Sequence, residues 1–284
     1  MDDADLALVQ ALASRIWSRA ARHHPGQLAW SARYAEDTSS VVRTWVEDDV
    51  VVGWAWAEAP DWLELCLDPE FPHATDVARE MVGRFVSTAP EQPTSTMVLA
   101  GKHHLLPVLH EWGFHQDVRA PWFTHHHLEL VSLPAVPDVA GYRLRAVDEG
   151  EAAPRAACHR LAWESGTVTT AAYDALMRTP PYRPGLDWVA VAPDGTWVAS
   201  CLVWLDPATG VALIEPVGCA PGHRRRGLAS AVSLAALHAA RDAGATEALV
   251  CPRGDDGYPV PRALYREMGF QPGERTITLV REPD

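Results

Sequence analysis

The spacing of apolar residues is clearest from residue 142 onward. Short apolar runs bounded by turn residues predict strands, whereas longer alanine-rich stretches that end in glycine predict helices. The strands expected in this half cover residues 142–147, 186–192, 196–205, 211–219, 246–251 and 275–281. The helices expected there cover residues 149–163, 228–243 and 259–268. An antiparallel meander followed by helix, strand, helix and strand predicts an α/β fold with a mixed sheet.

The first 131 residues repeat this order loosely. Strands are expected at residues 40–47, 50–58, 62–67 and 96–100, and helices at residues 5–22, 74–88 and 103–112. The last predicted helix of each half ends in a similar run, Trp112-Gly113-Phe114 in the first and Met268-Gly269-Phe270 in the second. We therefore predict a duplicated domain, with copies at 1–131 and 142–284 joined by a proline-containing linker at 132–141. Chance similarity of two α/β halves is the alternative.

Composition and charge narrow the class of protein. The chain has 284 residues, 48% of them apolar, so it can bury a core without a metal or a disulfide. Its net charge of −13 disfavours nucleic acid as a partner, because such binding needs a basic surface. Five cysteines without a C-x-x-C pair predict reduced thiols in a cytoplasmic protein. Neither a run of about 18 apolar residues nor a secretion signal is found, so no membrane span is expected.

The predicted strand 211–219 runs into a basic loop, residues 220–226, that opens the predicted helix from residue 228. The first turn of a helix has unpaired N–H groups and the positive end of the helix dipole, which together form an anion site. Gly227 and the small Ala229 allow a ligand to approach the backbone, and three consecutive arginines add positive charge. The loop therefore predicts a diphosphate site. It is neither a Walker loop nor a dinucleotide-binding turn, whose glycine patterns are absent.

The run Arg224-x-x-Gly227-x-Ala229 resembles the Q/R-x-x-G-x-G/A motif of the GNAT N-acetyltransferase superfamily. The later segment from Leu264 to Phe270 looks like the L-Y-x-x-x-G-F segment of many members. The resemblance covers nearly all of residues 142–284 and implies two tandem GNAT-like acyl-CoA acyltransferase domains, the second catalytic. It implies acetyl-CoA as acyl donor, with its pyrophosphate held at Arg224, Arg225, Arg226, Gly227, Leu228 and Ala229. It also implies that backbone groups of Val217, Gly218 and Cys219 pair with the pantetheine arm.

The resemblance also implies catalytic roles. Glu215 is the candidate base, because related enzymes often carry an acid at this point of the strand; the alternative is a solvent-facing strand-end glutamate. Tyr265 matches the tyrosine that protonates the departing sulfur; the alternative is a core tyrosine. We expect Cys219 to be structural, since direct attack by the amine is usual in the family. One departure from the family concerns the pantetheine contacts: many relatives carry an asparagine after the strand at 246–251, and this chain contains no asparagine.

The first half lacks these features at the matching positions. Pro72, Thr75 and Val77 stand where the second half has Arg224, Gly227 and Ala229. Its loop carries two acids and no arginine, and a leucine at position 109 replaces the tyrosine. We therefore expect residues 1–131 to be a degenerate copy that braces the active half or lines the amine site.

The histidine runs at 103–104 and 125–127 lack acidic or cysteine partners at a metal-like spacing, so we expect surface histidines and no metal site. The resulting hypothesis is an acetyl-CoA-dependent N-acetyltransferase in which a small-molecule amine attacks directly. It implies a monomer or homodimer with no nucleic-acid or membrane partner. The alternatives are a non-catalytic acyl-CoA-binding sensor or complex subunit, and an aminoacyl transferase that uses charged tRNA.

Overall fold

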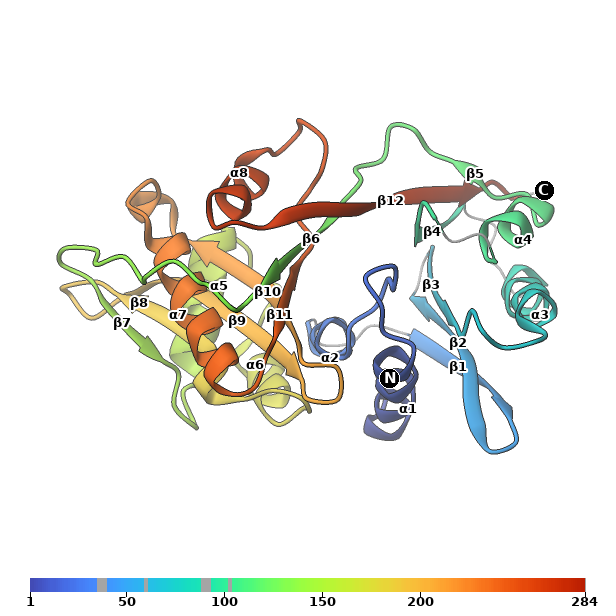
Figure 1. Ribbon diagram of the computed structural model, residues 1–284, viewed down its shortest axis with the longest axis horizontal. Helices are drawn as coiled ribbons and strands as arrows, with labels where there is room; N and C mark the ends of the chain where they lie inside the picture. Colours follow the sequence, from blue (N-terminus) through green and yellow to red (C-terminus); the bar gives the residue numbers. More distant parts are fainter. Residues whose placement is uncertain (35–39, 59–60, 88–92, 102–103, 284) are drawn as a thin grey trace.

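One continuous mixed sheet runs through the molecule (Figure 1). The computed structural model describes residues 1–34, 40–58, 61–87, 93–101 and 104–283. The strands are β1 Ser40–Glu47, β2 Val50–Glu58, β3 Trp62–Leu67, β4 Thr94–Leu99, β5 His115–Gln116, β6 Thr124–Glu129, β7 Arg143–Ala146, β8 Asp187–Val191, β9 Trp197–Asp206, β10 Val211–Cys219, β11 Glu247–Val250 and β12 Gln271–Arg281. Their order in the sheet is β1-β2-β3-β4-β12-β6-β11-β10-β9-β8-β7, with β5 paired to β12. The predicted α/β fold with a mixed sheet is confirmed.

The helices cover the two halves of this sheet separately (Figure 1). They are α1 Asp3–Arg15, α2 Pro25–Arg33, α3 Ala74–Ser87, α4 Leu106–Glu111, α5 Ala152–Trp163, α6 Thr170–Met177, α7 Leu228–Asp242 and α8 Val260–Glu267, with short 3-10 turns η1 Pro184–Leu186 and η2 Pro221–His223. One core cluster packs α7 against β8 to β11, and another packs α3 and α4 against β2, β3, β4 and β12. None of the helices within the described residues has the length and apolar character that crossing a membrane requires.

The two halves exchange their last strands. β6 comes from the first half of the chain but pairs antiparallel with β11 in the sheet of the second half. β12 comes from the second half but pairs antiparallel with β4 over Thr276–Arg281 in the sheet of the first half, and the chain therefore ends there (Figure 1). The halves are thus interlocked through β6 and β12, which also contact each other. The boundaries 1–131, 132–141 and 142–284 stay a prediction.

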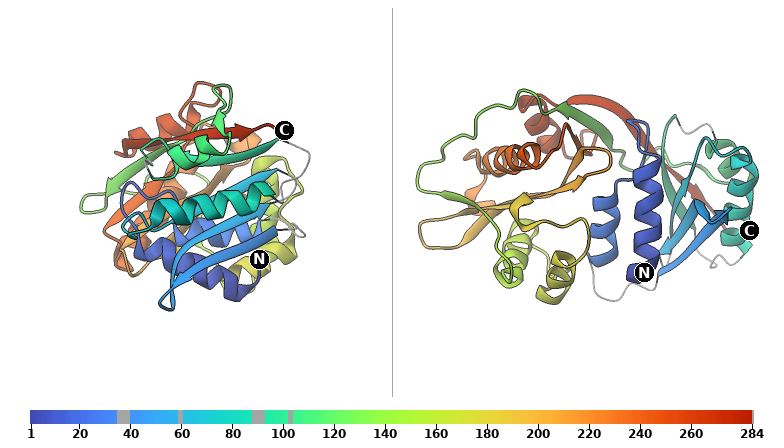
Figure 2. Two further views of the ribbon diagram at one scale, coloured as in Figure 1. Left: turned by 90° about the vertical axis from the view of Figure 1, so that its right-hand side faces the viewer. Right: turned by 60° about the horizontal axis from the view of Figure 1, so that its bottom comes forward.

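The N-terminal segment lies between the halves (Figure 2). Helix α1 contacts β1 and β2, whereas α2 contacts α6, β9 and β10. The predicted helix over residues 5–22 is too long: α1 ends at Arg15, and a second helix begins at Pro25, a residue suited to a first helical turn. Gly26 allows close packing here, because a Cβ atom on it would lie 2.1 Å from Cβ of Trp204 on β9.

The histidines at 125–127 are buried, so the prediction that they lie on the surface is wrong. Their exposed fractions are 1%, 0% and 7%. The cause is the strand exchange: β6 lies inside the sheet, between β11 and β12, and not at its edge. Of the other predicted surface histidines, His103 lies outside the described residues. Within the described ranges, no group of three or more histidine, cysteine or acidic side chains is arranged to hold a metal ion.

Candidate functional site

The parallel strands β10 and β11 separate partway along their length. They pair at three positions, Val211 to Leu213 with Glu247 to Leu249, in the part of the chain that the structure describes. β10 then continues to Cys219, whereas β11 ends at Val250. The strands therefore leave an opening beside the second half of β10.

Backbone groups of β10 point into this opening. The N–H group of Ala220 donates to Val198 O on the β9 side, in the same register as the pair of Gly218 and Ser200. Hydrogen-bonding direction alternates along an antiparallel strand, so the N–H groups of Val217 and Cys219 point away from β9. The three predicted pantetheine contacts therefore differ: the backbone of Gly218 pairs with β9, whereas the N–H groups of Val217 and Cys219 face the opening.

The predicted diphosphate loop follows β10 directly. Gly227 precedes α7 with φ +81° and gives the helix no side-chain cap, so the first N–H groups of α7 are not held by a capping side chain. Arg225 also has a positive φ of 61°. Left-handed residues alternating with ordinary ones gather N–H groups into a concave anion site. Arg225, Arg226 and Gly227 are exposed, whereas the side chain of Leu228 is in the core, so Leu228 offers only its backbone.

Arg224 has a bracing role in this loop. Its guanidinium donates to Cys219 O at 3.0 Å and to Ala162 O at 3.1 Å, which ties the loop to the end of α5. The adjacent Trp163 closes the same region, because a Cβ atom on Gly218 would lie 2.1 Å from its ring. These contacts hold the loop and the end of β10 in one position.

Glu215 lies on β10 at the mouth of the opening. Its backbone oxygen accepts a hydrogen bond from the indole of Trp204 at 2.6 Å, which fixes this point of the strand. Burial raises the pKa of its carboxyl to about 7, and the positive charge of Arg22 acts against that rise. A carboxyl with this pKa can take up and release a proton near neutral pH.

A cavity of about 180 Å³ lies between the two halves, with Glu215 on its wall. Both halves and the N-terminal segment contribute to it: it is lined by Arg22, His24, Gln27, Met97, Phe123, His125, Leu213, Glu215, Leu249, Cys251 and Thr276. Burial lowers the pKa of His24 to about 4 and that of His125 to about 3, so both imidazoles are neutral at pH 7. The charged side chains on this wall are therefore Arg22 and, when ionised, Glu215.

Tyr265 on α8 is buried, with 5% of its surface exposed, and its ring packs edge-on to Phe270. Burial raises the pKa of its hydroxyl above the ordinary value, and the neighbouring Cys201, Cys251 and Glu215 act in the same direction. Tyr265 therefore holds its proton at neutral pH and lies within the electrostatic reach of Glu215. The two predicted catalytic residues belong to one region of the molecule.

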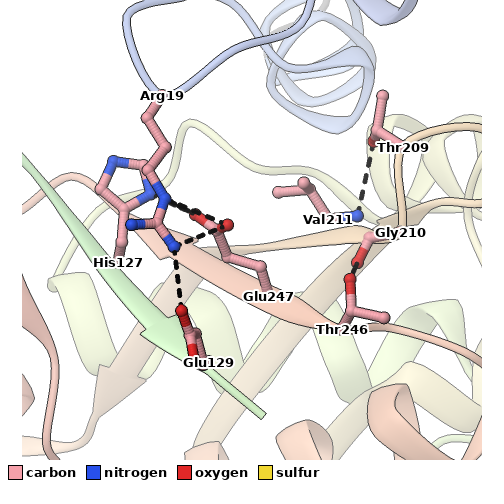
Figure 3. A network of polar contacts seen from close by, with 8 residues as sticks. All are labelled: Arg19, His127, Glu129, Thr209, Gly210, Val211, Thr246 and Glu247. Atoms are coloured by element: carbon pink, nitrogen blue, oxygen red, sulfur yellow. Dashed lines mark hydrogen bonds and ion pairs between the residues drawn. The ribbon is translucent and has the colours of Figure 1, made fainter.

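An ionic cluster fixes the segment that carries Arg22 (Figure 3). Arg19 donates to both carboxylate oxygens of Glu247 on β11, at 3.1 and 3.2 Å, and lies 3.6 Å from Glu129 on β6. His127 lies 2.6 Å from the same Glu247 carboxylate. Next to it, His24 Nε2 lies 3.2 Å from Val211 O, at the start of β10. The first half is thus attached to the strands that form the opening.

The first half has a similar pair of strands without the basic loop. β3 and β4 are parallel and pair at Trp62–Ser95 and Leu63–Thr96. The loop after β3 carries Asp68, which forms an ion pair with Arg15 at 2.7 Å. The basic residues that follow β10 have no counterpart in this loop, and that the first half is a degenerate copy stays a prediction.

The sequence alone does not identify the residues of the first half that line the cavity. Arg22, His24 and Gln27 fall where one long helix was expected or just after it, and no motif marks them. The sequence predicts His125 on the surface. The only signal was the unusual run of three histidines in a chain with 13 histidines in all.

Comparisons with known proteins give a consistent result. Residues 152–270 match the model of the acetyltransferase (GNAT) family. No curated protein matches the chain. Among solved structures, the chain is similar to a tandem GNAT protein from the clavulanic acid biosynthesis pathway (TM-score 0.65, 18% identity, 100% of this chain and 96% of that chain). A GCN5-related N-acetyltransferase from Sphaerobacter thermophilus gives a TM-score of 0.61 at 18% identity, over 99% and 94% of the two chains. A GNAT-family acetyltransferase from Colwellia psychrerythraea gives a TM-score of 0.64 at 12% identity, over 99% of this chain and 97% of that chain. At these identities the likeness shows the fold.

Proposed function

We propose that this chain, whose residues 152–270 match the GNAT family model, is an acetyl-CoA-dependent N-acetyltransferase of tandem form that acts on a small-molecule amine. The observation that carries the proposal is one continuous arrangement. The uncapped start of α7, the opening beside β10 and the cavity with Glu215 follow one another along the same strand and loop.

In this proposal the second half binds the donor. Backbone N–H groups at the start of α7, with the exposed Arg225 and Arg226, hold the pyrophosphate, and Arg224 keeps the loop in shape. The outward N–H groups of Val217 and Cys219 pair with the pantetheine arm and stabilise negative charge on the thioester oxygen as it develops. Acetyl-CoA supplies the activated acetyl group.

The chemistry is direct attack by the amine. Glu215 accepts a proton from the amine, directly or through water, so that the nitrogen has a free electron pair. As the new C–N bond forms and the C–S bond breaks, Tyr265 donates its proton to the departing sulfur. The nitrogen then loses its second proton, which restores the tyrosine through water, and Glu215 releases the first proton to solvent. The products are the acetylated amine and CoA with a free thiol. Cys219 takes no covalent part in this scheme.

The first half, residues 1–131, supports the site without binding the donor. It contributes the cavity wall that includes Arg22 and Met97, and the cluster of Arg19 with Glu247 keeps this wall against β11. The strand exchange supports this role, because β6 of the first half brings His125 into the same cavity.

The first prediction tests the donor site by calorimetry with acetyl-CoA. In the double variant Arg225→Glu with Arg226→Glu, we expect affinity to fall at least about tenfold, because two attractive charges become repulsive beside the pyrophosphate. Arg119→Glu is the matched control: its side chain is 92% exposed on the first half, and affinity should be unchanged. Undiminished affinity in the loop variant would refute the assignment of the donor site.

A further inference from the structure

We infer that the cavity between the halves is built for an amine that also carries a carboxylate, with Arg22 receiving the carboxylate and Glu215 facing the amine. This inference rests on the proposed function, because the amine is the acceptor of the acetyl group. It identifies the acceptor as a small amino acid or a similar zwitterion, and Arg22 as the residue that selects it.

The first argument is that Arg22 has unused hydrogen-bonding capacity. One terminal nitrogen of Arg22 forms an ion pair with Glu64 at 3.7 Å and donates to the sulfur of Met97 at 3.7 Å, so these contacts engage only that nitrogen. Among the described residues, its buried Nε atom has no hydrogen-bond partner. A guanidinium that is 83% buried and has an unsatisfied N–H group favours an anion with two oxygens, since these bind its fork geometry.

His125 supplies the second argument. It lines the same cavity with only 1% of its surface exposed, and neither ring nitrogen has a hydrogen-bond partner among the residues that the structure describes. A neutral imidazole offers one N–H donor and one acceptor. Leaving such atoms unpaired in a buried place costs free energy, so a polar ligand group beside Arg22 would satisfy both side chains.

The third argument concerns charge and size. Arg22 and Glu215 lie on the wall of one cavity, so it offers a positive and a negative group to a single ligand. Its volume of about 180 Å³ is below the range of about 300–1,000 Å³ that is usual for drug-sized ligands. A small zwitterion fits both the size and the opposite charges, whereas a peptide or nucleotide does not.

The binding test uses fragments and needs no chemistry. Propionate and the neutral propionamide have similar shapes and differ in charge. We expect propionate to shift the NMR signals of the Arg22 Nε–H group and of the His125 ring, and propionamide at equal concentration to leave them in place. The Arg22→Gln variant, checked for folding by thermal unfolding, should no longer bind propionate, and Arg22→Lys should retain part of the binding. Equal shifts from both fragments, or none, would overturn the inference.

The activity test pairs amines with and without a carboxylate. Glycine, β-alanine and γ-aminobutyrate are compared with methylamine, ethylamine and propylamine, with free CoA as the readout. We expect kcat/KM to favour the carboxylated member, and Arg22→Gln to remove about 10- to 100-fold of that preference through KM. Arg119→Gln serves as the control. Equal rates within each pair would overturn the inference. Release of no CoA from any amine, with propionate still bound at Arg22, would instead count against the proposed transfer and leave the anion subsite standing.

Discussion

Glu215 is the residue on which the pH dependence of the proposed reaction rests. Its burial raises its pKa to about 7, and only the ionised form accepts a proton. The second prediction is therefore that kcat/KM falls as pH falls through about 7. In the Glu215→Gln variant, this acidic limb of the pH–rate profile should disappear. We also expect kcat to drop about 10²- to 10⁴-fold, with the affinity for acetyl-CoA unchanged.

The matched control for this prediction is Glu267→Gln, an exposed glutamate on α8. A pH–rate profile at saturating donor makes the comparison. If Glu215→Gln keeps the wild-type limb near pH 7, another group is the base.

Tyr265 is the second residue to which we assign a proton transfer. The third prediction is that Tyr265→Phe lowers kcat about 10²-fold or more while the Kd for acetyl-CoA stays within about twofold, because the packing of the ring is retained and only the proton donor is lost. Tyr258→Phe is the control, since Tyr258 is 52% exposed. An unchanged kcat at saturating substrates would leave Tyr265 as a core residue only.

At the scale of elements, the exchange of β6 and β12 makes the folding of each half depend on a strand from the other half. β12 pairs with both β4 and β6, so it belongs to both halves. The fourth prediction is that a chain ending at residue 270 loses cooperative unfolding in both halves, seen as loss of the urea transition by tryptophan fluorescence and circular dichroism. A truncated chain that retains a cooperative transition in the first half would show that β12 is dispensable there.

Strands with clear alternation or a marked turn could be predicted closely. β1, β2, β3 and β10 have the expected bounds, because turn residues or a short loop limit each of them. Helix α2 and strand β6 could not be predicted. α2 has only nine residues, with a glycine at its second position that weakens the helix signal, and β6 is largely a run of histidines without apolar alternation. Their positions are set by packing on distant strands.

The residues of the candidate site also fall into a group that the sequence could identify and a group that it could not. The loop at 220–229, Glu215 and Tyr265 are local features of consecutive elements, so a motif could identify them as candidates. Arg22 and His125 reach the cavity only because the N-terminal segment and β6 pack against the second half. Such contacts join residues about a hundred or more positions apart, and no local pattern records them.

At the scale of the whole molecule, the buried histidines make the fold sensitive to acid. Burial lowers the pKa of His23 and His24 to about 4 and that of His125 and His159 to about 3, from 6.5. The unfolded chain therefore takes up protons below about pH 6.5 that the folded chain refuses. The stability that these groups contribute is complete above pH 6.5 and is lost as the pH falls toward 4.

The fifth prediction follows from this difference. The free energy of unfolding in urea should fall between pH 7 and pH 5, and His159→Gln should reduce the slope, whereas the exposed His73→Gln should not. Glu215 acts in the opposite direction, because its raised pKa favours the folded state as the pH falls from about 7, but four imidazoles outweigh one carboxyl. A free energy that stays level or rises toward pH 5 would contradict this account.

The central claim is that the second half alone holds the acyl donor, along the loop at 220–229 and the opening beside β10. A crystal structure of the intact chain with acetyl-CoA tests it most directly. We predict the pyrophosphate at the start of α7 and the pantetheine arm beside Val217 and Cys219, with the thioester toward Glu215. Acetyl-CoA bound instead beside β3 and the loop that carries Asp68, or away from α7 altogether, would contradict the claim.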